Sequence, residues 1–321
     1  MYIDSYKDTI NACRFCFMCR HLSAAGNVTF RESDTPRGRA LLTAKMAKNL
    51  RELHPDFVDA FYRAELSAAN RFHCVSHYDE AGLILAARRD IVEAGLAPEN
   101  VKKLAAKLKK VSFKVEGSGD ALYYIDSYGS KANVPKDCKV ISGGDTGKAL
   151  EVLGFAKEAD AVFAKFQVAV KASGCKTVVT SCPASYDMMK KRLKGVKVLH
   201  SSEFIKGKRG SGTVYYLDSD YLKNYQEKMT APRDLLTKLG YTLKPFGTNN
   251  EESYSAGEGA VIYDLINPEL AEKLCNRIVE LTDSPATDVL VTASPYTKYV
   301  LNKFAPQLKI LLIDEVASKG I

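Results

Sequence analysis

Apolar residues recur at helical spacing through about the first 115 residues of the chain. The clearest helix start is Asp34–Pro36, where a capping side chain precedes a proline suited to the first turn. Gly95 suits the C-terminal stop of a later helix. The expected helices cover residues 37–50, 56–67, 80–93 and 98–110. No convincing strand pattern accompanies them, so we predict a helical segment here.

Beyond residues 116–119, a glycine-rich stretch that we interpret as a linker, the pattern changes. Short apolar runs now alternate with helical patterns, and this alternation predicts parallel α/β sheets. The expected strands cover residues 121–125, 139–142, 177–181, 196–200, 213–217, 288–293 and 309–313.

Part of the second segment is repeated. Residues 174–205 align without a gap on residues 286–317, and Tyr123–Ser127 resembles Tyr215–Ser219. The identical positions of the longer match are Val179, Thr180, Pro183, Lys191, Lys197, Leu199 and Glu203, which recur as Val291, Thr292, Pro295, Lys303, Lys309, Leu311 and Glu315. We therefore predict three domains: a helical domain over 1–115, and two homologous α/β domains over 120–210 and 211–321.

Composition adds that the chain resembles an ordinary soluble protein, with 46% hydrophobic and 26% charged residues. No apolar stretch approaches the ~18 residues that a membrane-spanning helix needs. The N-terminus does not have the pattern of a signal peptide. We expect a cytoplasmic protein without a transmembrane segment.

The formal net charge is +8, and lysines gather at 102–103 and 107–110. This basic helix is interpreted either as a solvated face or as a docking surface for an acidic partner. No recognisable nucleic-acid-binding motif surrounds the lysines, so nucleic acid is not an expected partner.

Cysteine spacing gives the strongest chemical signal. Three of the eight cysteines fall within seven residues, as Cys13-x2-Cys16-x2-Cys19, the spacing that bacterial ferredoxins use for three ligands of a 4Fe–4S cluster. The fourth ligand of such a cluster comes from a distant cysteine, here Cys74. We expect Arg14, Phe15, Phe17 and Met18 to surround this site.

The ligands of a second cluster are missing. At ferredoxin spacing, its four positions are occupied by Ser23, Ala64, Ser67 and Asn70, none of which offers a thiolate. We therefore predict one 4Fe–4S cluster, with Cys13, Cys16, Cys19 and Cys74 as cofactor-binding and metal ligands. A structural Zn²⁺ ion bound by the same cysteines is the alternative.

Other candidate residues have simpler interpretations. Cys182 ends a strand before Pro183 and is either a reactive thiol at a helix start or a small packed residue. It is the only candidate catalytic residue, and a weak one. His21, His73 and His77 lie beside cluster cysteines and are expected near the surface rather than as cluster ligands.

With these motifs placed, nearly the whole chain resembles a family that includes glycolate oxidase iron–sulfur subunits, lactate-utilisation iron–sulfur proteins and heterodisulfide reductase subunits. The matching segments are the cluster cysteines, Pro36–Arg39, Ile91–Pro98, Thr180–Pro183 and Thr292–Pro295. The resemblance implies a helical ferredoxin-like domain followed by two α/β cysteine-rich (CCG) domains with parallel sheets.

The CCG motifs themselves are degenerate. Asp145–Gly147 and Ser255–Gly257 stand where the family has paired cysteines before a glycine. Other family cysteine positions are occupied by Ser127, Ser185, Asp220, Ser294 and Thr297, and Cys182 alone is retained. The additional catalytic metal centres of the family are therefore not expected here.

The resemblance implies a non-catalytic electron-transfer subunit of an oxidoreductase. Its partner would be a flavoprotein, an FAD-linked oxidase or dehydrogenase of 2-hydroxy acids, with the FAD on that partner. Two alternatives stay open: a scaffold or assembly subunit with a structural cluster, and a thiol or disulfide reductase that uses Cys182.

Overall fold

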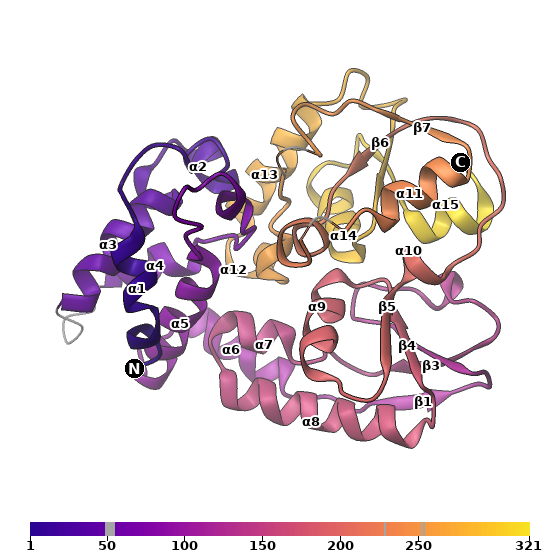
Figure 1. Cartoon of the computed structure of the whole chain (residues 1–321), viewed down its shortest axis with the longest axis horizontal. Helices are drawn as coiled ribbons and strands as arrows, with labels where there is room; N and C mark the ends of the chain where they lie inside the picture. The colour runs from indigo at the N-terminus through magenta and orange to yellow at the C-terminus, as the bar shows by residue number, and fades with distance from the viewer. Residues whose placement is uncertain (49–54, 228, 251, 253) are drawn as a thin grey trace.

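The computed structural model describes residues 1–48, 55–227, 229–250, 252 and 254–321. The described chain mixes helices with two mainly parallel sheets, which agrees with the predicted α/β class. Figure 1 shows the N-terminal helices beside two sheet-containing parts, with the first sheet below and the second above in that view. No helix in the described ranges is long and apolar enough to cross a membrane.

The N-terminal part is built from short helices, and a helix is present in each of the four predicted ranges. Residues 49–50 of the first range lie outside the described residues, and the helix predicted over 56–67 ends at Tyr62, before the left-handed Leu66. Asp79 caps α5 by accepting a hydrogen bond from the Gly82 amide at 3.2 Å, and Gly95 ends the helix in a left-handed conformation. The helices are η1 Tyr2–Tyr6, α1 Lys7–Ala12, α2 Ala24–Thr29, η2 Glu32–Asp34, α3 Pro36–Lys48, α4 Pro55–Tyr62, η3 Ala69–Phe72, α5 Glu80–Glu93 and α6 Glu99–Leu108.

The first sheet has the strand order β1-β3-β2-β4-β5. Its strands are β1 Lys114–Glu116, β2 Ala121–Tyr124, β3 Cys138–Ser142, β4 Thr177–Thr180 and β5 Lys197–His200. The accompanying helices are η4 Lys131–Asn133, α7 Lys148–Leu153, α8 Ala156–Ala172, α9 Pro183–Arg192 and α10 Ser201–Phe204. All pairs are parallel except β1–β3. The predicted linker over 116–119 is therefore corrected at its first residue. Glu116 is the last residue of β1 and does not belong to a flexible stretch.

The second sheet has the order β7-β6-β8-β9 and is parallel throughout. Its strands are β6 Gly212–Leu217, β7 Tyr241–Lys244, β8 Val289–Thr292 and β9 Lys309–Leu312. Its helices are η5 Tyr221–Tyr225, α11 Ala231–Lys238, η6 Glu258–Ala260, α12 Tyr263–Ile266, α13 Pro268–Glu280, α14 Pro295–Phe304 and α15 Ile313–Lys319. Strand β7 was not predicted.

The sequence repeat corresponds to repeated structure. The elements β4-α9-β5-α10 recur in the same order as β8-α14-β9-α15. Cys182 and Ser294 occupy equivalent N-cap positions and accept hydrogen bonds from the Ser185 and Thr297 amides. Equivalent capping interactions by Glu203 and Glu315 start α10 and α15.

One buried arginine joins the N-terminal helices to the first sheet's helices. The Arg88 side chain is 0% exposed and donates hydrogen bonds to the carbonyl oxygens of Phe61, Ala64 and Val152. Burial lowers the pKa of Arg88 to about 10, so the side chain stays charged at neutral pH. Its multiple carbonyl partners compensate for the loss of water and fix the end of α4 against α7.

Candidate metal centre

The cysteine site begins in the loop between α1 and α2. Cys13 ends α1 in an extended conformation, and Phe15 turns the chain with a positive φ of 52°. The Phe15 amide donates to Cys13 Sγ at 3.4 Å. Cys74 belongs to a different segment, the turn after η3, and its amide donates to the Asn70 carbonyl oxygen at 3.1 Å.

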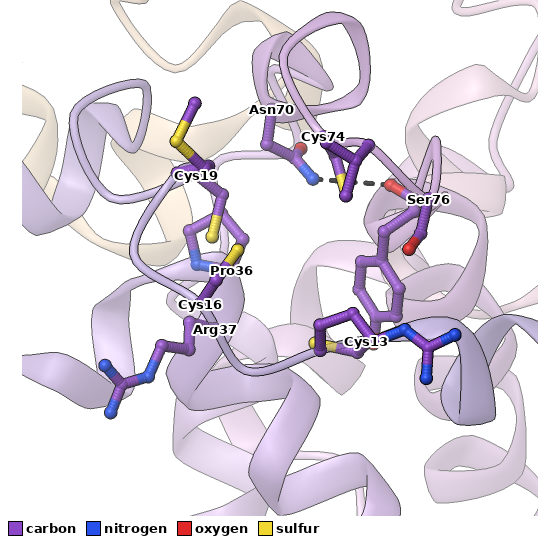
Figure 2. A pocket seen from close by; sticks show the side chains of 12 residues that line it. Cys13, Cys16, Cys19, Pro36, Arg37, Asn70, Cys74 and Ser76 are labelled. Atoms are coloured by element: carbon purple, nitrogen blue, oxygen red, sulfur yellow. Dashed lines mark hydrogen bonds between the residues drawn. The ribbon is translucent and has the colours of Figure 1, made fainter.

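These two segments bring the four selected cysteines to one pocket (Figure 2). The pocket is lined by Cys13, Arg14, Cys16, Met18, Cys19, Pro36, Arg37, Asn70, Cys74, Val75, Ser76 and Tyr78. Four thiols from two segments therefore share one cavity, although Cys74 is far from the others in sequence.

The four thiols differ in exposure. Cys16 is exposed, whereas Cys13, Cys19 and Cys74 are half-buried. Burial, together with the nearby Glu80 carboxylate, raises the pKa of Cys19 to about 11. Burial is also the main cause that raises the pKa of Cys13. A bound metal would reverse this preference, because coordination removes the thiol proton. Four soft sulfur ligands suit an iron–sulfur cluster or Zn²⁺.

The segment Pro36–Arg39 supports one side of the pocket. Pro36 and Arg37 line it, and the Arg37 guanidinium lies 4.2 Å from the centre of the Phe17 ring. Gly38 has no room for a side chain, because a Cβ atom would come within 1.9 Å of the Glu32 carbonyl oxygen. Each of these residues thus has a packing or charge contact that a substitution would change.

Arg39 completes this segment in a fully buried ion-pair network. Its side chain is 1% exposed, pairs with Glu80 and lies 3.8 Å from Glu65. Burial acts to lower the pKa of Arg39, but the two carboxylates outweigh it and raise the pKa above its ordinary value. The network joins α3 to α5 and to the segment after α4.

The pocket has cationic and apolar neighbours. Arg14 and Arg37 both line it, and positive charges beside a thiolate cluster stabilise the anionic form of the sulfur ligands. Of the residues expected to surround the site, Arg14 and Met18 line the pocket, whereas Phe15 and Phe17 do not. The Phe15, Phe17 and Met18 side chains are 39%, 63% and 50% exposed, so this side of the loop is open to solvent.

With Val75, which is 77% exposed, Phe15, Phe17 and Met18 form a set that we call the apolar rim. Exposed apolar side chains of this size, gathered beside a pocket, are typical of surfaces that contact another molecule.

The four positions where a second cluster would have its ligands are occupied by packed residues. Ser23, Ala64, Ser67 and Asn70 are all buried. Ser23 caps α2 and donates from its hydroxyl to the Asp34 carbonyl oxygen at 2.9 Å. The Ser67 carbonyl oxygen accepts from Asn224, and the Asn70 amide nitrogen donates to the Tyr78 carbonyl oxygen.

Three pocket residues were missed by sequence reasoning. Val75, Ser76 and Tyr78 follow Cys74 by one, two and four residues and line the pocket. The Ser76 hydroxyl donates to the Ala12 carbonyl oxygen at 2.8 Å and so ties the Cys74 turn to the end of α1. Their proximity to Cys74 in sequence was the available signal.

Cys182 lies elsewhere, between β4 and α9, and is 6% exposed. Burial, with the nearby Asp126 carboxylate, raises the pKa of Cys182 well above its ordinary value. A thiol with a raised pKa and little access is a poor nucleophile. Cys138, Cys175 and Cys275 are likewise buried.

Three buried polar residues of the second α/β segment form a hydrogen-bonded cluster. Ser255 donates to Asp220 at 2.6 Å, while the Asp220 amide donates to Glu258 at 2.6 Å. Burial and their mutual repulsion raise the pKa of Asp220, and burial raises that of Glu258. Asp220 and Ser255, which the resemblance places at cysteine positions, thus make internal hydrogen bonds.

Comparisons with known protein families, with curated proteins and with solved structures gave no match. The four-cysteine pocket is thus the feature of the molecule from which a function has to be inferred.

Proposed function

We propose that Cys13, Cys16, Cys19 and Cys74 hold one 4Fe–4S cluster, and that the protein is an electron-transfer subunit of an oxidoreductase. The observation that supports this most directly is that all four cysteines line one pocket. Such a cluster, when bound, supplies a carrier that accepts and releases one electron. The chain itself would be a non-catalytic subunit.

The residues around the pocket have matching roles in this proposal. The four thiolates would bind the cluster, and Arg14 and Arg37 would stabilise its negative charge. The contact of Ser76 with Ala12 would keep Cys74 in place opposite the N-terminal loop. The buried Arg39–Glu80 pair would hold α3 and α5 in position beneath that arrangement.

Electron transfer is favoured over a purely structural role by the position of the site at the surface. Cys16 is exposed, and the apolar rim offers a partner protein a contact area next to it. We propose as partner an FAD-linked oxidase or dehydrogenase of 2-hydroxy acids, which would carry the flavin. We place the complex in the cytoplasm, where a reducing environment keeps thiols such as these eight free cysteines from forming disulfides.

The second candidate function is a scaffold with a structural metal. It is supported by the way the site links two chain segments, since a cluster or Zn²⁺ ion would fasten the α1–α2 loop to the turn that carries Cys74. The two functions need the same ligands and differ in whether the site exchanges electrons.

Metal analysis tests the site itself. Protein purified without oxygen should contain about four iron and four sulfide per chain, because four thiolates complete one cluster. Replacing any of Cys13, Cys16, Cys19 or Cys74 by serine should remove most of it, whereas Cys182→Ser should not. Stoichiometric zinc without sulfide, or about eight irons, would refute the proposal.

Rapid mixing separates electron transfer from scaffolding. The cluster-loaded chain, in complex with a co-purifying flavoprotein, is mixed with that partner's 2-hydroxy-acid substrate. An electron-transfer subunit should be reduced at a rate that keeps pace with turnover, about 1–1000 per second for typical enzymes. The substitution Phe17→Ser at the apolar rim should slow this reduction without loss of iron. A cluster that stays oxidised through many turnovers would favour the scaffold.

A further inference from the structure

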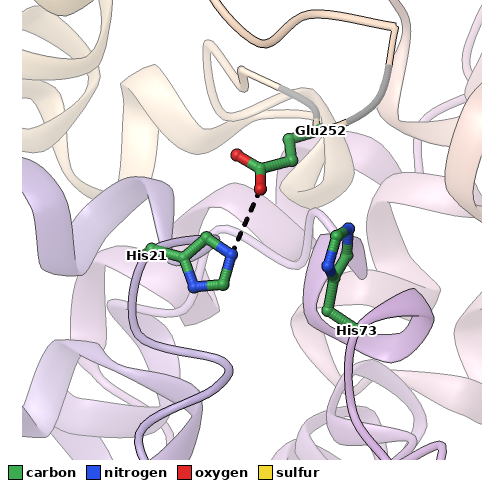
Figure 3. A group of neighbouring side chains, drawn as sticks. All are labelled: His21, His73 and Glu252. Carbon is green, nitrogen blue, oxygen red and sulfur yellow. Dashed lines mark ion pairs between the residues drawn. The ribbon is translucent and has the colours of Figure 1, made fainter.

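We infer that His21, His73 and Glu252 form a second metal site, which binds one divalent transition-metal ion such as Zn²⁺ or Co²⁺ (Figure 3). These three side chains are not among those that line the four-cysteine pocket, although His21 lies two residues from Cys19 and His73 is adjacent to Cys74. Its ligands come from three segments: the turn after Cys19, the end of η3, and the stretch between β7 and η6.

The geometry brings the ligand atoms close together. One nitrogen of each histidine and one Glu252 oxygen all lie within 4.8 Å of one another. His21 Nε2 is 3.1 Å from Glu252 Oε1, and the two imidazole rings stand edge to face with centres 5.7 Å apart. Ligand atoms of one zinc ion lie roughly 3–4 Å apart, so small side-chain rotations complete the site.

The two histidine nitrogens and the Glu252 oxygen match the ligand preferences of divalent transition metals. Two imidazoles and one carboxylate suit Zn²⁺ and neighbouring transition metals, and three protein ligands leave a position for water. His21 and Glu252 also line a pocket, together with Tyr254 and Arg277, which gives such a water ligand space. None of the three ligand side chains is buried, so an ion can reach them.

The backbones that carry the ligands are held together independently of a metal. Across the boundary between the N-terminal helices and the second α/β segment, Asn224 donates to the Ser67 carbonyl oxygen at 2.7 Å. Tyr225 donates to the Leu66 carbonyl oxygen at 2.6 Å. On the far side, the Glu252 amide donates to the Thr248 carbonyl oxygen at 2.8 Å. A site whose backbone is already arranged loses little conformational entropy on binding.

An ion pair between His21 and Glu252 alone would explain only part of this arrangement. It explains the contact of His21 with Glu252, but it does not account for His73, whose ring is directed at the same place. Two histidines converging on one carboxylate are what a bound cation requires, since each neutral imidazole offers it a nitrogen lone pair.

Co²⁺ titration of the full-length, cluster-loaded protein tests the inference, because Co²⁺ reports its ligands by absorption. Binding to nitrogen and oxygen gives weak visible bands, whereas thiolate ligands add intense near-ultraviolet bands. We expect one Co²⁺ per chain without the thiolate bands. His21→Ala, His73→Ala and Glu252→Gln should each weaken its binding by about tenfold or more, the loss that even an outer partner of a metal ligand causes.

His77→Ala is the matched control, because His77 is an exposed histidine near Cys74 that is not in the group. It should leave Co²⁺ binding unchanged. Absence of the weak-band species, or equal binding in Glu252→Gln and the parent, would overturn the inference. Iron and sulfide are measured in every variant. Intense thiolate bands together with absent iron would count against the proposed cluster, whereas the weak bands alone decide on the second site.

Discussion

Cysteine performs three different tasks in this chain, and the surroundings of each sulfur decide which. Four cysteines line one pocket, Cys182 caps a helix, and Cys138, Cys175 and Cys275 are buried. The capping role follows from the repeat, in which Ser294 makes the same contact at the start of α14. Sulfur at position 182 is therefore interchangeable with oxygen.

Replacement of Cys182 tests this interpretation. Cys182→Ser should keep the acceptor for the Ser185 amide and leave cluster content and electron transfer within about twofold, a barrier change of roughly 0.4 kcal/mol. Cys182→Ala should lose the cap and lower the free energy of unfolding by about 0.5–2 kcal/mol. Urea unfolding and iron analysis measure both effects. A hundredfold loss of activity in the serine variant, with the cluster intact, would instead favour a thiol enzyme.

At the two proposed metal sites, the sequence allowed prediction of the residues whose spacing along the chain is characteristic. Cys13, Cys16 and Cys19 are close in sequence, and ferredoxin spacing pointed to Cys74. The group of His21, His73 and Glu252 could not be found in this way, because Glu252 reaches the histidines only through the folding of distant segments. The exposure of Phe15, Phe17 and Met18 was also not predictable, since it depends on the left-handed turn at Phe15.

Among the elements, α3 has the most constrained start. Gly38 packs against the backbone of η2, where a Cβ atom would meet the Glu32 carbonyl oxygen. Because Pro36 and Arg37 line the cysteine pocket, displacement of this helix start also displaces a wall of the site.

Gly38→Ala should lower the free energy of unfolding by about 1–3 kcal/mol, the usual cost of forcing extra volume into a packed site. Reduced iron content should accompany the loss. Gly129→Ala is the matched control, because its new Cβ would come no closer than 3.0 Å to the side chains of Asp126 and Ile125. Thermal or urea unfolding compares the two variants. If both variants had the same free energy of unfolding, the clash with the Glu32 carbonyl oxygen would not determine the stability of the Gly38 variant.

Helix α6 is the other element with a testable role. It buries Val101 and Ala105 and exposes Lys102, Lys103 and Lys107, as the basic helix predicted from sequence requires. If an acidic partner docks there, Lys102→Glu with Lys103→Glu should slow cluster reduction at low salt and weaken its salt dependence. Lys238→Glu with Lys273→Glu, at exposed positions of α11 and α13, is the control with the same change in charge. Equal rates in both would leave the apolar rim as the docking surface.

Periodicity predicted the elements that have strong patterns. The four long N-terminal helices and seven strands were found because apolar residues repeat along them at the expected period. Strand β1 was missed because its three residues are all exposed, at an antiparallel edge. Strand β7 was missed because only Tyr241 of its four residues is buried. Short edge strands carry too few buried positions to show a period. The predicted domain boundaries remain a prediction.

At the scale of the whole molecule, a small set of buried polar groups joins the two α/β segments. His200 Nε2 lies 3.3 Å from the carbonyl oxygens of both Ser181 and Ala293, the residues that directly follow β4 and β8 respectively. Asp314 accepts hydrogen bonds from Ser201 and Tyr123. Side chains of the first α/β segment thus form hydrogen bonds with the second α/β segment across this boundary.

Acid should weaken this boundary through His200. Burial lowers the pKa of His200 to about 4 from an ordinary 6.5, so the native state binds fewer protons than the unfolded chain. Stability is therefore full above pH 6.5 and falls as the pH decreases toward 4. Between pH 7.5 and 5, His200 should account for a loss of about 2 kcal/mol in the free energy of unfolding.

Urea unfolding at both pH values, with cluster content matched, measures this loss of stability. The variant His200→Gln should not show the loss, although it keeps a side-chain N–H donor for the carbonyl oxygens of Ser181 and Ala293. Asp314 acts in the opposite sense, because burial raises its pKa to about 6 and favours its protonated form in the native state. The glutamine variant should consequently be less acid-sensitive than the parent. An unchanged pH slope would assign the acid sensitivity to other groups.

The distance between Cys19 and Cys74 along the chain has a consequence during protein synthesis. A ribosome adds about 5–20 residues per second, so the first three thiols precede the fourth by roughly 3–11 s. Throughout that interval the nascent chain offers an incomplete ligand set, without Cys74, Ser76 or Tyr78. Insertion of the proposed cluster would therefore have to wait for translation of the second segment. Ribosome-bound chains that stop before Cys74 should not retain iron, whereas chains that extend past α5 should.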